Sequence, residues 1–98
     1  MKKFVFLYQG QGPTEPTAEG MKAWGDWFAS LGEHLVDGGN PFGAGREVTT
    51  SGATDLSHAA TPITGYTIVN AADLDEAQQL LAGCPMSTAV RVYEALPM

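Results

Sequence analysis

The sequence has one cysteine, few basic residues and no long hydrophobic run, and each scarcity excludes a class of protein. Cys84 alone forms neither an intramolecular disulfide nor a multi-cysteine zinc site. Five Lys and Arg against 11 Asp and Glu give a formal net charge of −6, which repels a phosphate backbone, so we expect no nucleic-acid binding. No stretch approaches the roughly 20 apolar residues of a membrane span, so we expect no membrane association.

The length and the start of the chain indicate one small cytoplasmic domain. Ninety-eight residues suit a single domain, residues 1–98, which buries only about 60 to 65% of its unfolded surface and therefore has a thin core. The apolar run 4–8 follows Lys2 and Lys3 but is too short for a signal peptide. We therefore expect the protein in the cytoplasm.

Residues 63–85 have the clearest secondary-structure pattern in the chain, and they predict a strand followed by a short helix. Residues 63–69 are rich in β-branched and aromatic residues, a composition typical of strands. Asp73 and Glu76 then fit a capping box, in which Asp73 caps the helix and Glu76 reaches back to the cap amide. The apolar stripe of this helix comprises Leu74, Ala77 and Leu81. Gly83 and Pro85 end the helix.

The first half of the chain predicts a central strand and a longer helix. Residues 4–8 are apolar at every position, so both faces of this strand must be covered. After a polar loop at 9–16, Thr17 can cap a helix that Gly38 and Gly39 end. The expected apolar stripe comprises Met21, Trp24, Phe28, Leu31 and Leu35, with Trp27 at its edge.

Two further strands complete the expected fold. Residues 46–50 form a modest, mostly polar strand, and 88–96 form the last strand, in which Val90 and Val92 alternate with polar positions. Residues 51–62 are expected to be a long loop, a length that is often functional.

The order β-α-β-β-α-β predicts a ferredoxin-like α+β protomer, a four-stranded antiparallel sheet with both helices on one face. The opposite face then has no cover, although strand 4–8 is apolar on both sides. The residues Tyr66, Ile68, Val90 and Val92 are expected to add to the exposed side. Because soluble monomers rarely expose so large an apolar patch, we expect a homodimer in which two sheets pack face to face.

Several motifs together resemble the YCII-related (DGPF-type) family over nearly the whole chain. They are Met21-x2-Trp24, Gly38-Gly39-Asn40-Pro41-Phe42, Gly65-Tyr66 with Ile68-Val69, Asp73-Leu74-Asp75-Glu76-Ala77, Gly83-Cys84-Pro85 and the terminal Val90-x-Val92-Tyr93-Glu94-Ala95-Leu96-Pro97-Met98. The resemblance implies a dimeric α+β barrel and, in some branches, small-molecule chemistry through a His-Asp pair. Asp55 stands where the family's Asp lies, but residues 21–23 hold no His, and 54–58 lack the Asp-Gly-Pro-Phe motif.

Asp55 and His58 are the candidate catalytic pair. They lie three residues apart in the expected loop, and a carboxylate on one imidazole nitrogen fixes the tautomer and raises the basicity of the other. The alternative is that both are ordinary polar residues of a polar loop. Two histidines on different elements do not make a metal site, and we expect neither a metal nor a cofactor.

The leading functional hypothesis is a homodimer that binds a small molecule between the first helix, the sheet and the 51–62 loop. The expected pocket residues are Trp24, Trp27, His34 and Tyr66. Aromatic residues at helical spacing also form cores, which leaves a structural interpretation open. Two alternatives remain: a lyase or hydrolase of small organic acids that uses His58 as base and Asp55 as orienting group, and a structural or regulatory dimer without a ligand.

Overall fold

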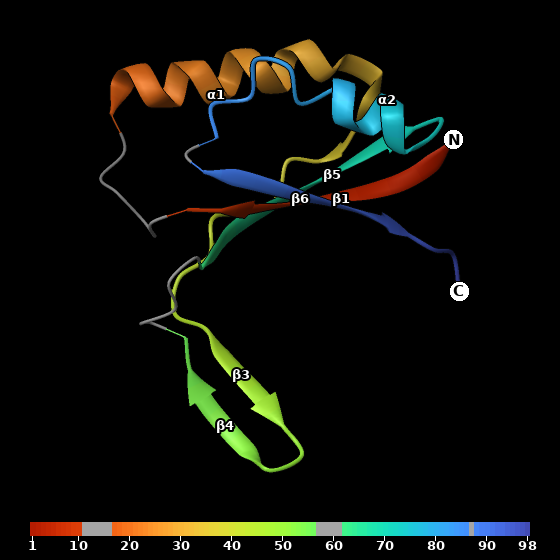
Figure 1. Cartoon of the computed structure of the whole chain (residues 1–98). Coiled ribbons are helices and arrows are strands. Elements are labelled where there is room, and N and C mark those ends of the chain that lie inside the picture. Colours follow the sequence, from red (N-terminus) through yellow and green to blue (C-terminus); the bar gives the residue numbers. More distant parts are fainter. Residues whose placement is uncertain (11–16, 57–61, 87) are drawn as a thin grey trace.

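The computed structural model describes residues 1–10, 17–56, 62–86 and 88–98, and shows an antiparallel sheet with helices above one face (Figure 1). In chain order the elements are β1 (Lys2–Gln9), α1 (Ala18–Leu31), the 3-10 turn η1 (Gly32–His34), β2 (Leu35–Asp37), β3 (Arg46–Thr49), β4 (Gly52–Asp55), β5 (Ile63–Ala71), α2 (Leu74–Gln79) and β6 (Ala89–Ala95).

Four of the strands form one sheet in the order β2-β5-β1-β6. β1 lies between β5 and β6 and is antiparallel to both, which confirms the prediction that this strand is central. Both helices lie on the same face, also as predicted (Figure 1). The arrangement is α+β and compatible with a ferredoxin-like fold.

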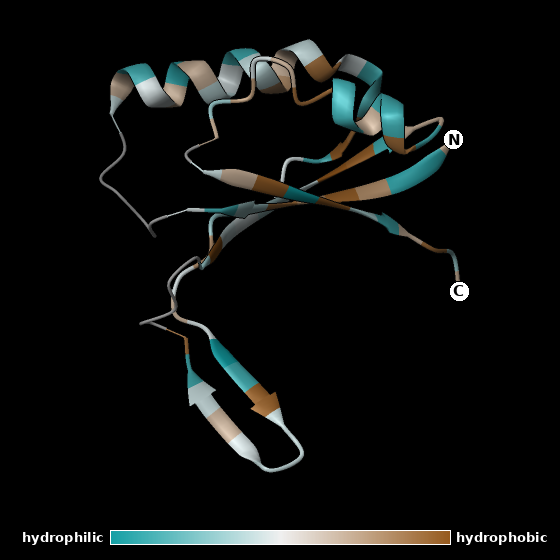
Figure 2. Cartoon of the chain, viewed as in Figure 1, coloured by the Kyte–Doolittle hydropathy of each residue, from teal (hydrophilic) through white to brown (hydrophobic). Residues whose placement is uncertain are grey.

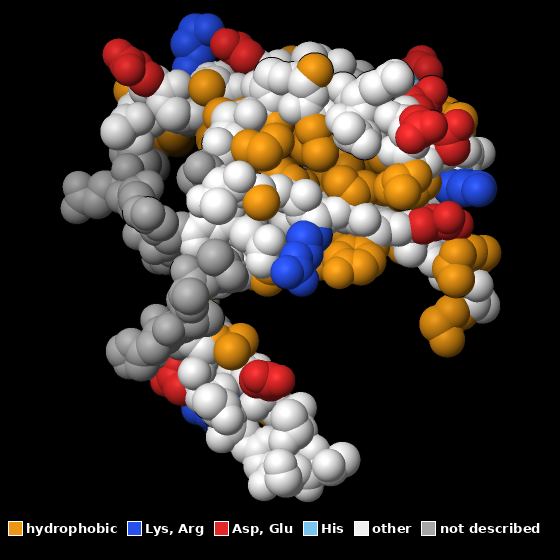
Figure 3. Space-filling model, viewed as in Figure 1, with side chains coloured by type: hydrophobic (Ala, Val, Ile, Leu, Met, Phe, Trp, Pro, Cys, Tyr) orange, Lys and Arg blue, Asp and Glu red, His pale blue; other side chains and the backbone are white. Residues whose placement is uncertain are grey.

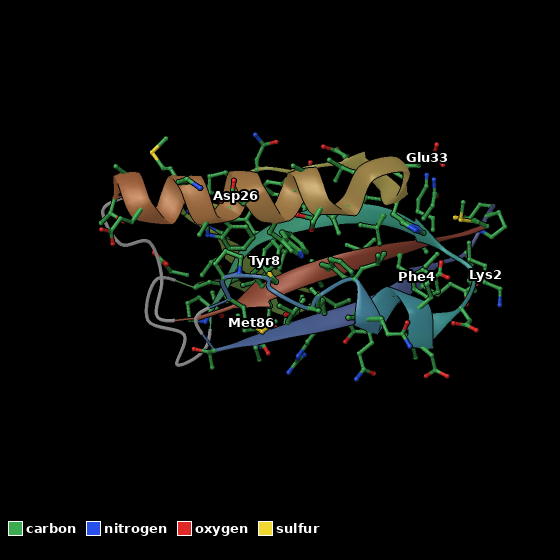
Figure 4. All side chains as sticks on the ribbon, turned by 90° about the horizontal axis from the view of Figure 1, so that it is seen from above. Lys2, Phe4, Tyr8, Asp26, Glu33 and Met86 are labelled. Carbon is green, nitrogen blue, oxygen red and sulfur yellow. The ribbon has the colours of Figure 1, made fainter. Side chains whose placement is uncertain are left out.

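The core lies between the sheet and the helices. Phe4 and Phe6 of β1 point toward the helices and are fully buried, whereas Val5 and Leu7 point the other way because side chains alternate along a strand. The buried apolar residues are Phe4, Phe6, Trp27, Leu31, Val69, Ala71 and Ala77. Figure 4, which looks down on the helical side, places Phe4 and Tyr8 toward opposite ends of β1. Figure 2 shows hydrophobic residues running through the four-stranded sheet.

α1 begins at the predicted cap, but its buried stripe differs from the predicted one. The Gly20 amide donates to the Thr17 hydroxyl over 2.9 Å. Trp27, expected at the edge of the stripe, is only 3% exposed, whereas Met21 is 65% exposed. The residues that pack inward are Trp24, Trp27, Phe28 and Leu31, an i, i+3, i+4, i+7 set. The prediction included Met21 because its spacing fits the same helix face, yet this first turn extends beyond the core.

The end of α1 also corrects the sequence prediction. The helix stops at Leu31, where Gly32 has a positive φ of 53° and its amide bonds back to the Ala29 carbonyl. Leu35 was predicted to continue the helix but instead begins β2, where it pairs with Val69. Gly39, expected to end the helix, lies after β2.

α2 confirms the predicted cap and corrects its details. The Asp73 side chain accepts from the Glu76 amide over 2.8 Å. Glu76 reaches back to the amide of Ala72 over 3.0 Å, one residue before the expected cap amide. Ala77 is buried, but Leu74, expected on the buried stripe, is exposed because it occupies the first turn beyond the edge of the core.

The middle of the chain differs most from the prediction. Residues 46–49 do not join the four-stranded sheet: they form β3, which pairs with β4 in a separate hairpin. β4 occupies 52–55, inside the segment predicted to be loop, and 57–61 lie outside the described residues. The strand that follows α1 in the sheet is β2, although the helical spacing of Leu35 predicts a helix there.

The last strand presents its valines to the helices. Val90 pairs across from Tyr8 and Val92 from Phe6, so both share the helix-facing side and pack against the core. The expectation that they add to the uncovered face is therefore wrong, because the register of β6 decides its face and the alternation alone does not. Within the described residues, no helix is long and apolar enough to cross a bilayer.

Candidate functional site: the uncovered sheet face and the hairpin base

The uncovered sheet face carries an apolar centre. Strand register places Val5, Ile68 and Tyr93 in one row, and Leu7, Tyr66 and Arg91 in the next. Tyr93 is 54% exposed. Asp37 of β2 pairs with Ile68 after a register shift and adds a carboxylate at the end of the first row. We call the set Val5, Leu7, Tyr66, Ile68 and Tyr93 the open face. No described helix covers it, since both helices lie above the other side (Figure 1).

The segment after β2 shields one end of the open face. The Phe42 amide donates to the Thr64 carbonyl over 2.8 Å, which ties this segment to the start of β5. The Phe42 ring stacks on Tyr66 with 5.6 Å between centroids. Phe42 itself is still 40% exposed, so the stack extends the apolar surface and does not close it.

Basic residues border this apolar centre. Lys3 lies in the row next to Val5, beside Asn70 and Ala95, and Arg91 lies beside Leu7. Neither Lys3 nor Arg91 forms an ion pair with any described residue. An apolar centre with a polar and charged rim is the usual composition of a protein interface.

A shallow hollow lies at the base of the β3–β4 hairpin. It measures about 280 Å³, opens widely to solvent and is lined by Ala44, Gly45, Arg46 and Asp55. Arg46 and Asp55 are cross-strand partners in the hairpin register. The amide of Leu56 donates to the Gly45 carbonyl over 3.0 Å, which closes the hairpin base. A guanidinium and a carboxylate therefore flank one open hollow.

The structure describes one residue of the predicted catalytic pair. Asp55 ends β4 at this hollow, whereas His58 lies outside the described residues.

Two of the four predicted pocket residues come together, but inside the core. Trp24 and Trp27 are in edge contact, with ring centroids 5.7 Å apart. The Trp27 indole N–H donates to the Leu80 carbonyl over 2.9 Å. Tyr8 fills the space beneath them, with its ring centroid 5.1 Å from that of Trp24. These rings pack on one another, so the described residues between α1 and the sheet form a filled aromatic cluster.

The other two predicted pocket residues lie elsewhere. Tyr66 belongs to the open face, on the side of the sheet away from Trp24 and Trp27. His34 lies in η1, where its Nδ1 is 2.8 Å from the Asn70 carbonyl oxygen and 3.8 Å from the Glu76 carboxylate. These contacts join η1 to the end of β5 and the start of α2. The structure therefore does not bring the four residues together.

A chain of hydrogen bonds crosses the core below the aromatic cluster. The Tyr8 hydroxyl donates to the Thr67 hydroxyl over 2.6 Å, and Thr67 donates to the Gly38 carbonyl over 3.0 Å. Burial raises the pKa of Tyr8 above its ordinary value of 10.0, and the hydrogen bond between Tyr8 and Thr67 opposes this shift only partly. Tyr8 therefore stays a neutral donor at physiological pH.

Cys84 has the character of a structural thiol. It is half-buried against the core, and burial raises its pKa to about 11. A thiol with so high a pKa holds little thiolate at neutral pH, so Cys84 is a poor nucleophile. In the part of the chain that the structure covers, no group of three His, Cys, Asp or Glu side chains is placed to hold a metal ion.

Sequence reasoning missed Val5, Leu7 and Tyr93 as one surface, and Arg46 as a partner of Asp55. The unbroken apolar run 4–8 predicted that both sides of β1 are apolar, but only strand register shows which residues of β5 and β6 share each side. No protein-family model matches the chain, and no significant match to a curated protein was found.

Proposed function

We propose that this protein acts as a homodimer in which the open faces of two copies pack together. The observation that carries the proposal is the apolar row Val5, Ile68 and Tyr93, which lies uncovered at the middle of the sheet. A β-sheet that is apolar on both faces needs a layer on each side, and one chain supplies only one helical layer. A second copy covers the remaining face through the same residues, as a two-fold interface does.

We further propose that the protomer is a ferredoxin-like β-α-β-β-α-β unit of the YCII-related kind, with β3 and β4 as an inserted hairpin. The four strands of the main sheet occur in the chain as β1, β2, β5 and β6, with a helix after β1 and after β5. The dimeric α+β barrel implied by the resemblance pairs two such sheets, which agrees with the open face as the contact.

Small-molecule binding at the hairpin base is the second candidate function. The hollow of about 280 Å³ opens widely to solvent, so Arg46 and Asp55 rather than enclosure would hold a ligand there. Arg46 can pair with a carboxylate through two parallel hydrogen bonds, so a small organic acid suits the site. If His58 joins Asp55 there, the same site supports the alternative of a lyase or hydrolase with His58 as base.

The dimer is tested by a matched pair of variants. Tyr93 and Leu74 are each 54% exposed, but Tyr93 lies on the open face and Leu74 on the helical side. We expect wild type to sediment as a dimer, and Tyr93→Asp to raise the dimer dissociation constant at least 30-fold, about 2 kcal/mol, as for an interface hot spot. Leu74→Asp should leave it unchanged. A wild-type monomer at micromolar concentration would refute the proposal.

Ligand binding is tested separately by thermal shift. We expect a small organic acid to raise the midpoint of wild type, since a ligand that binds only the folded state stabilises it. Arg46→Ala should abolish the shift, and His58→Ala should reduce it only if His58 belongs to the site. If no acid in a broad panel shifts wild type, the structural dimer without a ligand becomes the better description.

A further inference from the structure

The β3–β4 hairpin stands apart from the body of the molecule. Its strands pack chiefly against each other, and every residue of both strands is exposed. The radius of gyration is 14.5 Å, larger than the roughly 13 Å of a compact chain of this length. A lone two-stranded hairpin is marginally stable in water at best, so this one needs a surface to pack on.

The hairpin extends to the same side as the open face. Figure 1 shows it beyond the sheet on the side away from the helices, and the C-terminal end lies on that side too. Figure 3 shows the hairpin separated from the body on the face that it displays. A second copy seated on the open face would therefore lie within reach of the hairpin.

Each face of the hairpin carries two cross-strand pairs. Val48–Ala53 and Arg46–Asp55 share one face, whereas Glu47–Thr54 and Thr49–Gly52 share the other. Val48 is 75% exposed. Figure 2 shows a hydrophobic segment near the end of β3. The first face therefore has an exposed apolar pair toward the tip and a charged pair at the base, whereas the second face has no apolar pair.

The open face alone has a modest footprint. The four strands lie about 4.8 Å apart and average about seven residues at 3.3 Å per residue, so the sheet spans roughly 440 Å². Stable interfaces bury about 800 Å² per partner, so further surface must join the contact. The hairpin is the nearest uncovered surface that lies on the correct side.

We propose that the β3–β4 hairpin is an arm that grips a second copy of this chain, with Val48 and Ala53 against the partner's body. The inference rests on the proposed dimer and adds a second contact to it. By two-fold symmetry each copy both extends an arm and receives one. The hollow lined by Arg46 and Asp55 then lies at the root of the arm, next to the subunit boundary.

The arm is tested with a matched pair of substitutions one residue apart. Ala53→Lys places a charge on the face of Val48, whereas Thr54→Lys places the same charge on the other face, opposite Glu47. We expect Ala53→Lys and Val48→Lys each to raise the dimer dissociation constant at least tenfold in sedimentation equilibrium. Thr54→Lys should change it less than threefold.

Amide hydrogen exchange gives an independent readout of the arm. We expect the amides of 46–55 to exchange at least tenfold more slowly in wild type than in the Tyr93→Asp variant at a concentration where that variant is monomeric. A dimeric wild type with no such protection, or with equal effects of Ala53→Lys and Thr54→Lys, would overturn the arm and leave the sheet-face dimer intact. A monomeric wild type would overturn both.

Discussion

The hydroxyl of Tyr8 donates to the hydroxyl of Thr67 over 2.6 Å, across neighbouring strands of the sheet and beneath the tryptophans of α1. Thr67 is fully buried and passes the hydrogen bond on to the Gly38 carbonyl. The pair therefore connects β1, β5 and the segment after β2 through polar groups inside an apolar core.

Two variants that break this hydrogen-bonded link should destabilise the fold by different amounts. Tyr8→Phe removes one hydrogen bond and should lower the free energy of unfolding by about 1 kcal/mol. Thr67→Val keeps the side-chain shape but leaves the Tyr8 hydroxyl and the Gly38 carbonyl without this partner, so we expect a loss of about 2 to 3 kcal/mol. Urea denaturation of both variants measures the difference. Equal losses would indicate that the bond to Gly38 contributes nothing.

Alkaline pH should weaken the fold through the same region. Burial raises the pKa of Cys84 from 9.0 to about 11, and raises that of Tyr8 above 10.0. Each of these two groups has a higher pKa in the folded state than in the unfolded state. Its contribution to stability is therefore complete below the pKa of the unfolded state, and is lost as pH rises through the pKa of the folded state. We therefore expect stability to fall above about pH 9. Cys84→Ala and Tyr8→Phe should each flatten this decline in denaturation curves measured between pH 8 and pH 11.

Gly39 should be intolerant of any side chain. Its φ is +76°, and a Cβ there would overlap the backbone carbonyl of Tyr66. A backbone atom cannot easily move aside. Gly39→Ala should therefore lower the free energy of unfolding by more than about 2 kcal/mol, which exceeds the usual cost of a non-glycine residue at positive φ. Gly43→Ala is the control, since nothing lies within 4 Å of its Cβ position. Thermal denaturation should show a loss only for Gly39→Ala.

Replacing Gly25 with alanine should stabilise the protein. Gly25 lies in the middle of α1 on an exposed side, and nothing lies within 4 Å of a Cβ placed there. Gly25→Ala should therefore stabilise the protein by about 0.5 to 1 kcal/mol, because alanine restricts the unfolded chain and favours the helix. A rise in the urea midpoint with an unchanged slope would confirm this, and a fall would contradict it.

Local features of the chain were predictable from sequence because they depend on neighbouring residues. Thr17 and Asp73 were identified as helix caps, since capping joins a side chain to an amide only three residues away. The central position of β1 followed from an apolar residue at every position of 4–8, which requires cover on both faces.

Features that depend on distant residues were decided only by the tertiary structure. Leu35 fits the helical spacing, yet Gly32 ends the helix and pairing with Val69 makes Leu35 part of a strand. Val92 faces the helices because it lies opposite Phe6, and alternation within β6 cannot specify which side that is.

The candidate site was likewise predictable from sequence only in part. Sequence alone identified Asp55, Tyr66 and an uncovered apolar side of the sheet. It placed Tyr66 both on that side, which the register confirms, and in a pocket with Trp24, which faces the core on the other side. It did not show that Arg46 pairs across from Asp55. Composition and short-range spacing determined which side chains are apolar and which helix ends are capped. Strand register, which is set by contacts between residues far apart in the chain, determined which of those side chains share a surface.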